Sequence, residues 1–214
     1  MIFDLDGVLV DAEPVHRAAS RRLVAPHVLT DAEYAAFIGA SIEAFAVWLR
    51  ERYALNEPPE AIAARYDTLV SAELESQRLP AFDGAHALLA ALRARGLPLA
   101  VASQSLPRWV ELTLASASLA AAFDVVMAAD AVARAKPAPD IYVHAAALLG
   151  VPAARCLAIE DSIPGVAAAV AAGMTVVQSQ QADTAVERQP GVFATVASLR
   201  VFELGWLDGA AGAP

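Results

Sequence analysis

Acidic side chains end two of the apolar runs in this chain of 214 residues. Asp4 and Asp6 close the run MIFDLDG near the N-terminus. Glu160 and Asp161 close the run RCLAIEDS much later in the chain. If both runs are strands of one open α/β sheet, their carboxyl ends border the crevice in which such sheets bind ligands. We therefore expect these four carboxylates to converge at one site.

Two further polar side chains follow apolar runs of the same kind. Ser103 ends the strand-like part of LPLAVASQS, and Lys136 lies in the loop after FDVVMAAD. Lys136 is the only lysine in the chain, and every other Lys or Arg position holds arginine. A lone lysine near an acidic crevice is therefore a candidate functional group.

Each of these residues also has a purely structural interpretation. Asp-Gly is a common turn dipeptide, and Asp161 or Ser162 could cap a helix that starts near Ile163. Ser103 or Ser105 could likewise cap the helix that follows it. Taken one at a time, a structural role is the more frequent one. The conjunction of four such elements, each at a strand end of the same predicted sheet, favours a functional site.

Strands and helices alternate in most of the sequence. The apolar runs predict strands near residues 1–7, 97–105, 123–130, 155–162 and 174–180. Helical spacing between them predicts helices over 85–95, 109–118, 141–149 and 166–172. Glycines stand where helix C-termini are expected, at Gly96, Gly150 and Gly173. This alternation predicts right-handed crossovers and a parallel sheet covered by helices.

The stretch from 13 to 79 breaks the alternation and contains no convincing strand. Its signals are the capping-box spacing of Thr30 and Glu33, a Ser41 cap for a helix running to Tyr53, and a proline pair opening a helix over 58–77. We expect an all-helical domain over 13–79, inserted into a core domain formed by 1–12 and 80–214.

Composition narrows the possible partners. The chain is 57% hydrophobic and 18% charged, which suits a protein that folds by itself. Its formal charge of −9 disfavours nucleic acid and anionic membrane surfaces as partners. No stretch approaches the roughly 20 apolar residues of a membrane span, and Asp4 stands where a signal peptide would be basic and then apolar. We expect a cytoplasmic protein, as a monomer or weak homo-oligomer.

Together the four motifs resemble those of the haloacid dehalogenase superfamily. The similar subclass carries a helical cap after the first strand and includes sugar-phosphate phosphatases and beta-phosphoglucomutase. The motifs stand as Asp4-Leu5-Asp6-Gly7-Val8-Leu9-Val10-Asp11, Ser103, Lys136-Pro137-Ala138-Pro139-Asp140 and Glu160-Asp161-Ser162. The resemblance implies a Rossmann-like α/β core with a parallel sheet and a smaller all-helical cap domain.

The resemblance also implies how the acidic residues act. Asp4 would attack phosphorus and form an aspartyl-phosphate, while Asp6 would protonate the leaving oxygen and later activate water. A carboxylate attacking a phosphate needs a cation that offsets the like-charge repulsion. Mg²⁺ prefers oxygen ligands, here the carboxylates of Asp4 and Asp161 and the carbonyl of Asp6, with Glu160 as an outer partner.

The remaining site residues would bind the phosphate and the rest of the substrate. Lys136 would balance the charge of Asp4 and of the phosphate, and the Ser103 hydroxyl would hold phosphate oxygens. Gln104 stands where such phosphatases frequently have asparagine, which makes it a candidate substrate contact. His16 matches a histidine that is frequent in relatives with a cap, and it would serve either the substrate or the hinge.

We therefore expect a Mg²⁺-dependent phosphatase acting on a small phosphorylated metabolite such as a sugar phosphate. The alternative is a beta-phosphoglucomutase-like mutase, which needs cations for a second phosphate. Leu106 and Ile42 occupy the corresponding positions here, and the substitutes would be the arginines of the first cap helix, Arg17, Arg21 and Arg22.

Two other classes fit the sequence less well. A dehalogenase needs no metal and is disfavoured because Asp6 accompanies Asp4. A phosphate-sensing module without turnover needs no cap, so the helical insert argues against it. Only three residues precede Asp4, fewer than is usual in this family, which is consistent with a natural start further upstream.

Overall fold

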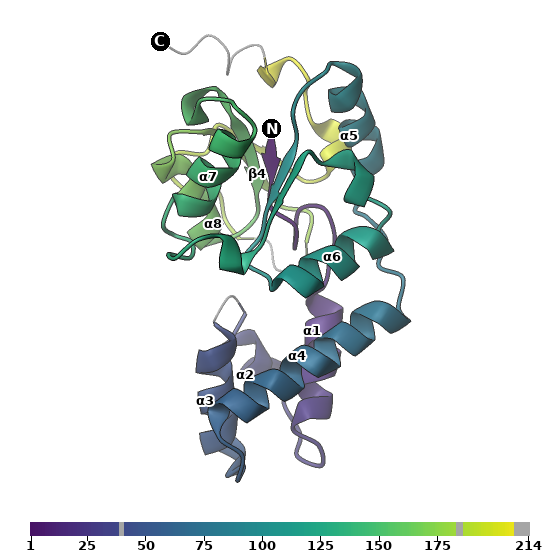
Figure 1. The fold of residues 1–214 in the computed structure, drawn as a ribbon, viewed down its shortest axis with the longest axis vertical. Coiled ribbons are helices and arrows are strands. Elements are labelled where there is room, and N and C mark those ends of the chain that lie inside the picture. The colour runs from purple at the N-terminus through teal and green to yellow at the C-terminus, as the bar shows by residue number, and fades with distance from the viewer. Residues whose placement is uncertain (39–40, 183–185, 208–214) are drawn as a thin grey trace. The chain divides into compact units, whose positions relative to one another are not determined.

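The computed structural model describes residues 1–38, 41–182 and 186–207, shown as a ribbon in Figure 1. Its contacts divide the chain into two compact units. One contains Met1–Asp11 and the chain from Leu79 onward, and the other contains Ala12–Arg78. Each unit has its own core, so the two are described separately.

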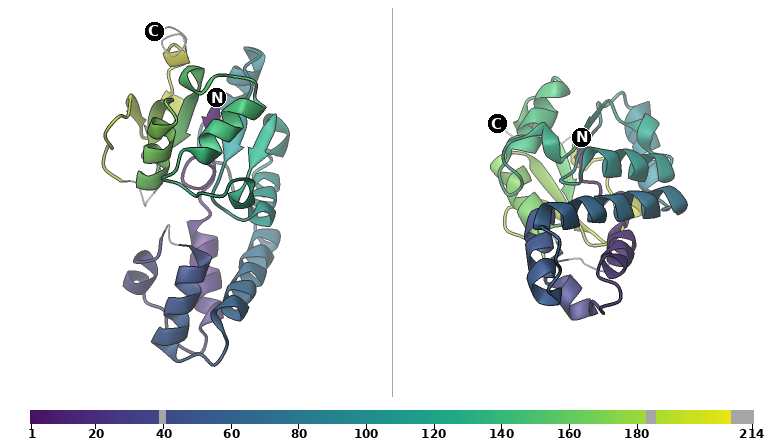
Figure 2. Two further views of the ribbon diagram at one scale, coloured as in Figure 1. Left: turned by 60° about the vertical axis from the view of Figure 1, so that its left-hand side comes forward. Right: turned by 60° about the horizontal axis from the view of Figure 1, so that its bottom comes forward.

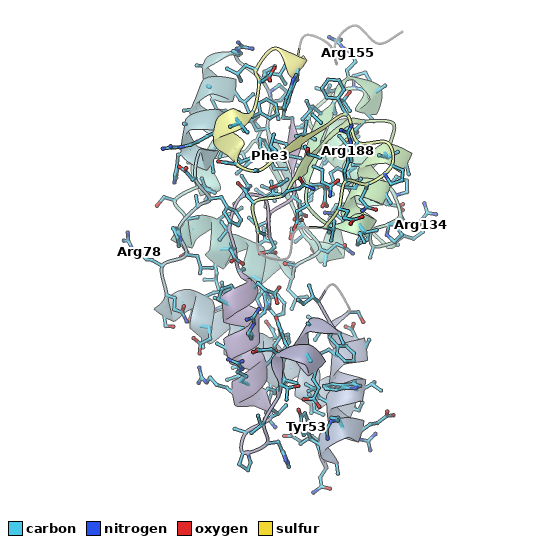
Figure 3. All side chains as sticks on the ribbon, turned by 180° about the vertical axis from the view of Figure 1, so that it is seen from behind. Phe3, Tyr53, Arg78, Arg134, Arg155 and Arg188 are labelled. Atoms are coloured by element: carbon cyan, nitrogen blue, oxygen red, sulfur yellow. The ribbon has the colours of Figure 1, made fainter. Side chains whose placement is uncertain are left out.

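The first unit is built on a six-stranded parallel sheet with the order β3-β2-β1-β4-β5-β6. Its strands are β1 (Ile2–Phe3), β2 (Ala100–Ala102), β3 (Val125–Met127), β4 (Leu157–Glu160), β5 (Thr175–Ser179) and β6 (Ala194–Val196). The central strand β1 pairs with β2 and β4, and Ile2 lies opposite Ala100 on one side and Ala158 on the other. Phe3 is fully buried inside the unit (Figure 3).

Helices cover both faces of this sheet (Figures 1 and 2). They are α5 (Ala85–Ala94), α6 (Pro107–Ser116), α7 (Asp140–Leu148) and α8 (Ile163–Ala171), with short 3-10 turns at η1 (Ala120–Ala122), η2 (Ala129–Ala131), η3 (Ala153–Arg155) and η4 (Leu199–Val201). The helices α7 and α8 share one core, in which Tyr142 and Val166 pack near Ile2 and Val176. Gly150 ends α7 with a φ of 69°, a left-handed conformation that glycine adopts without a Cβ penalty.

The predicted α/β fold is therefore confirmed, with one strand more than the sequence indicated. The five expected strands are present, and β6 adds a sixth beside β5. It spans three residues, Ala194–Val196, of which only Val196 is buried. Such a short edge strand carries too little apolar signal to be found from the sequence.

The second unit is helical in its described residues. It contains α1 (Glu13–Leu23), α2 (Asp31–Ala35), α3 (Ile42–Tyr53) and α4 (Pro59–Ser76), and α4 packs against both α1 and α3. The expected capping box is present, because Thr30 Oγ1 accepts from Glu33 N–H while the Glu33 carboxylate accepts from Thr30 N–H. Ser41 caps α3 as expected. Among the described residues, no helix has the length and apolar character of a membrane span.

Candidate active site

Backbone hydrogen bonds of the sheet place three polar residues at adjacent strand ends. Asp4 follows β1, and its N–H donates to the Ile159 carbonyl at 2.9 Å. Ser103 follows β2, and its N–H donates to the Met127 carbonyl at 3.0 Å. Glu160 is the last residue of β4. Because β2, β1 and β4 are neighbours and parallel, these residues lie along one edge of the sheet.

Lys136 joins this edge from the loop before α7. Its Nζ donates to Asp4 Oδ1 at 2.5 Å, to Glu160 Oε1 at 2.6 Å and to the Ala102 carbonyl at 3.0 Å. An ammonium group has three donors, and all three are used here. The Lys136 side chain is only 2% exposed, so water does not screen these interactions. The single lysine of the chain is thus a buried cation between two carboxylates.

Glu160 is fully buried, and both of its oxygens accept several hydrogen bonds. Tyr142 donates its hydroxyl to Oε1 at 3.0 Å, on the oxygen that also accepts from Lys136. The other oxygen accepts from the N–H groups of Asp161 and Ser162 and from the Ser162 hydroxyl, at 2.8–3.1 Å. These N–H groups lie at the start of α8, where a helix favours negative charge.

The first turn of α8 leaves space for this carboxylate because residue 165 is glycine. A Cβ built on Gly165 would overlap the Glu160 carboxylate. Ser162 caps α8 by accepting from Gly165 N–H, so the capping role considered for it is confirmed. Sequence reasoning missed both Gly165 and Tyr142. A tyrosine on an apolar helix is usually a core residue, and no sequence signal distinguishes this one.

The charges of the cluster shift one another's pKa values. Burial alone would raise the pKa of Glu160. The Lys136 ammonium and the hydrogen bonds that the Glu160 carboxylate accepts instead hold that pKa below its ordinary value. Burial raises the pKa of Asp4 well above its ordinary value, and the negative charges of Glu160 and Asp161 add to this despite Lys136. Burial would lower the pKa of Lys136, but Asp4 and Glu160 together raise it. Lys136 and Glu160 are therefore an ion pair at neutral pH.

Asp161 completes the acidic cluster. Oxygens of Asp4, Glu160 and Asp161 all lie within 4.8 Å of one another. Burial and the negative charge of Glu160 raise the pKa of Asp161 to about 7. A Cβ on Gly7 would overlap the Asp161 carboxylate, so the glycine of the first motif permits this close approach. When all three carboxylates are ionised, they and the one ammonium group carry a net charge of two negative units, which suits a divalent cation with oxygen ligands.

The side chain of Asp6 is oriented differently from that of Asp4. Its Oδ2 accepts from the Ser105 hydroxyl at 2.8 Å, while the N–H of Ser105 donates to Ser103 Oγ at 3.0 Å. Neither serine caps the following helix, since the N-cap of α6 is Leu106 and has no side-chain cap. The capping role considered for these serines is therefore wrong, because Leu106 and not a serine occupies the N-cap position of α6. Gln104 is exposed between them.

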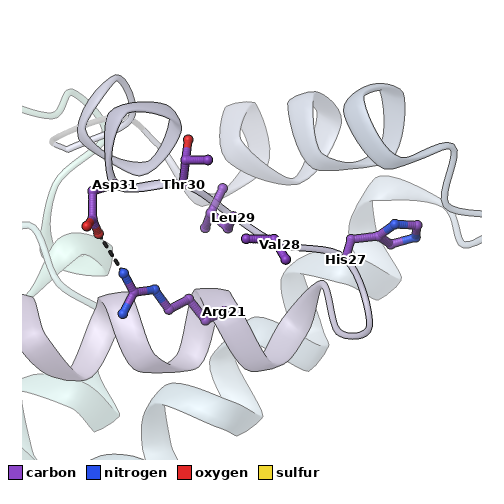
Figure 4. A pocket seen from close by; sticks show the side chains of 6 residues that line it. All are labelled: Arg21, His27, Val28, Leu29, Thr30 and Asp31. Atoms are coloured by element: carbon purple, nitrogen blue, oxygen red, sulfur yellow. Dashed lines mark hydrogen bonds and ion pairs between the residues drawn. The ribbon is translucent and has the colours of Figure 1, made fainter.

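His16 belongs to the helical unit. It lies on α1, and its Nδ1 is 3.1 Å from the Tyr66 hydroxyl oxygen. The same unit has a shallow pocket beside α1 (Figure 4), lined by Arg21, His27, Val28, Leu29, Thr30 and Asp31. Arg21 is paired there with Asp31 at 2.6 Å, and both side chains are more than half exposed. The pocket is thus a solvated surface feature with its charges balanced.

Comparison with known proteins identifies the family. The sequence model of the haloacid dehalogenase-like hydrolase family matches residues 1–173. Fructose-1-phosphate phosphatase YqaB from Escherichia coli is 34% identical, over 83% of this chain and 94% of its own. The crystal structure of CbbY from Rhodobacter sphaeroides in complex with phosphate has a TM-score of 0.86 and 28% identity, and covers 97% of both chains. The chain belongs to the haloacid dehalogenase-like hydrolase family.

Some relatives are much longer than this chain. The chain spans 17% of the length of Protein SUPPRESSOR OF QUENCHING 1, chloroplastic, from Arabidopsis thaliana, with 33% identity. The family and fold expected from the sequence are confirmed, and the protein is an enzyme of the hydrolase class.

Proposed function

We propose that this protein is a Mg²⁺-dependent phosphatase that hydrolyses a small phosphorylated metabolite through an aspartyl-phosphate on Asp4. The observation that carries the proposal is the buried contact of Asp4 with Lys136, at 2.5 Å, beside two further carboxylates. A fixed cation next to a carboxylate at a strand end suits attack on phosphate, since catalysis of phosphoryl transfer consists largely of positioning and charge neutralisation.

The acidic cluster fits a magnesium ion. Asp4 and Asp161 would provide carboxylate oxygens and Asp6 its backbone carbonyl, with Glu160 outside them because its oxygens already accept several hydrogen bonds. When bound, Mg²⁺ supplies positive charge that reduces repulsion between Asp4 and the phosphate. The physical reason for expecting a divalent ion is that Lys136 offsets only one of the three negative charges that the ionised carboxylates would carry.

The reaction proceeds in two steps on the side chains of the sheet unit. In the first, an Asp4 oxygen bonds to phosphorus, the ester P–O bond breaks, and Asp6 gives its proton to the leaving oxygen. In the second, water loses a proton to Asp6 and attacks phosphorus, which releases inorganic phosphate and restores Asp4. Lys136 stabilises the negative charge in both steps, and the Ser103 hydroxyl holds a phosphate oxygen.

Sugar phosphates are the substrate class that the relatives favour, and YqaB is named a fructose-1-phosphate phosphatase. Water as the final acceptor is favoured by Leu106 and Ile42, which open α6 and α3 at positions where a mutase would present cations. We propose that Gln104 contacts the sugar and that His16 serves either the substrate or the hinge. The cytoplasmic location and the monomeric or weakly associated state also remain predictions.

The direct test measures phosphate release from a panel of sugar phosphates, sugar acids and nucleotides, with Mg²⁺ and with a chelator. Asp4→Asn should abolish release and leave the circular dichroism spectrum unchanged, because the amide keeps the shape and loses the nucleophilic charge. Asp83→Asn is the matched control, since Asp83 is exposed and forms a solvent-accessible ion pair with Arg200. Substantial Mg²⁺-dependent release by the Asp4 variant would refute Asp4 as nucleophile.

A second assay separates hydrolysis from isomerisation. The enzyme is incubated with glucose 1-phosphate, a trace of glucose 1,6-bisphosphate and Mg²⁺, and both glucose 6-phosphate and inorganic phosphate are followed. We expect inorganic phosphate as the main product, because water rather than a sugar hydroxyl captures the aspartyl-phosphate. Efficient formation of glucose 6-phosphate with little inorganic phosphate would overturn the phosphatase proposal.

A further inference from the structure

The carboxyl group of Asp6 is held by a residue that none of the four motifs assigns to it. Ser105 Oγ donates to Asp6 Oδ2 at 2.8 Å across 99 positions of sequence. We propose that Ser105 is a positioning residue that orients the carboxyl group of Asp6 for proton transfer. This inference rests on the proposed phosphatase function and deepens it.

The backbone N–H and the backbone carbonyl of Ser105 each form a hydrogen bond. Its N–H donates to Ser103 Oγ at 3.0 Å, and its carbonyl accepts from Ala129 N–H at 3.0 Å. Ser103 is itself buried and bonded to β3 through the Met127 carbonyl. The hydroxyl of Ser105 is therefore presented to Asp6 from a fixed backbone, and it is half-buried, which limits competition from water.

The backbone of Asp6 is also fixed. Gly7 N–H donates to the Val10 carbonyl at 2.9 Å, and Leu9 N–H donates to the Leu5 carbonyl at 2.8 Å, which closes a tight turn around Asp6. The χ2 torsion of an aspartate is broad, so a fixed backbone alone does not determine where its two oxygens point. The Ser105 hydroxyl provides that constraint.

The hydrogen bond also holds one of the two oxygens of Asp6. The proton that Asp6 gives to the leaving oxygen, and the one that it takes from water in the second step, pass through a carboxyl group whose Oδ2 accepts from Ser105. Loss of the hydroxyl would let the carboxyl group rotate away from this orientation.

The test compares Ser105→Ala with the wild type on two esters that differ in their need for an acid. For fructose 1-phosphate, kcat/KM should fall about 10- to 100-fold, the usual effect of losing a hydrogen bond to a charged group. For 2,4-dinitrophenyl phosphate it should fall less than about threefold, because this leaving group departs without a proton. Ser105→Thr keeps a hydroxyl and should restore most of the activity.

A matched control and a double-mutant cycle complete the experiment. Ser179 is a buried serine whose hydroxyl donates to the Gly7 carbonyl at 3.4 Å, on the same turn as Asp6. Because this hydroxyl contacts the backbone and not the Asp6 carboxyl group, Ser179→Ala should leave kcat/KM unchanged for both esters. In an Asp6→Ala background, adding Ser105→Ala should cost less than about twofold, because a residue that acts through Asp6 has no effect without it.

The outcomes separate the two proposals. Equal losses on both esters, no loss on either, or fully additive losses in the double mutant would overturn the positioning role and leave the phosphatase function intact. Failure of the wild-type enzyme to release phosphate with Mg²⁺ from these two esters and from every substrate of the panel would refute the proposed function, and this inference with it.

Discussion

Replacing Lys136 by methionine removes the one cation of the buried cluster and keeps most of the apolar stem. Two carboxylates and the Ala102 carbonyl would lose donors at 2.5–3.0 Å. Breaking a buried ion pair by removing one partner costs about 3–5 kcal/mol, because the remaining charge is buried without compensation. We expect the free energy of unfolding to fall by about this amount at neutral to alkaline pH without Mg²⁺.

The loss should depend on pH in a defined direction. Without Lys136, the folded-state pKa values of Asp4 and Glu160 lie above their unfolded values of about 3.9 and 4.3. Groups with raised pKa values destabilise the fold when pH exceeds the unfolded pKa, since the folded state disfavours the charged form. The deficit should therefore be large near pH 8 and shrink as the pH falls toward about 4.

Urea unfolding followed by circular dichroism, in buffer with a chelator at two pH values, measures this deficit. Arg134→Met is the matched control, because the Arg134 side chain projects from the surface (Figure 3) and is 72% exposed in its ion pair with Asp140. The control should unfold like the wild type. A Lys136→Met variant as stable as the wild type near pH 8, or a deficit that does not change with pH, would refute the reasoning.

Lys136→Met should also lower phosphatase activity by at least about 100-fold, the usual effect of removing a fixed charge from the transition state. Lys136→Arg keeps the charge but should recover only part of the activity, because a planar fork cannot reproduce three contacts made from a single nitrogen. Full activity in the arginine variant would show that charge alone matters at this position.

Three further predictions concern other parts of the chain. Gly165→Ala should displace the Glu160 carboxylate and destabilise the fold by about 1–3 kcal/mol, whereas Gly205→Ala meets no neighbouring atom; equal urea midpoints would contradict this. Mg²⁺ affinity by calorimetry should rise as the pH increases through about 7, because Asp161 must lose its proton to bind the ion; a flat profile would exclude that titration. Thr30→Ala removes the cap of α2 and should lower the thermal midpoint, at a cost of about 1 kcal/mol; an unchanged midpoint would contradict it.

The sequence by itself determined the class of fold and where the chemistry would gather. Short apolar runs that alternate with helical segments predict parallel strands, since strands buried on both faces are short and almost continuously apolar. Asp4, Ser103 and Glu160 each stand where such a run ends, so a parallel sheet brings them to one edge. The roles of these residues in catalysis remain predictions.

Only the tertiary structure decided which atoms meet. The bond of Lys136 to Asp4 joins residues 132 positions apart, and that of Ser105 to Asp6 joins residues 99 positions apart. Sequence periodicity reports whether a residue faces a core, but it carries no information on which distant side chain occupies the same space. Tyr142 therefore has the sequence pattern of a core residue, and its hydrogen bond to Glu160 follows only from the packing of α7 against the sheet.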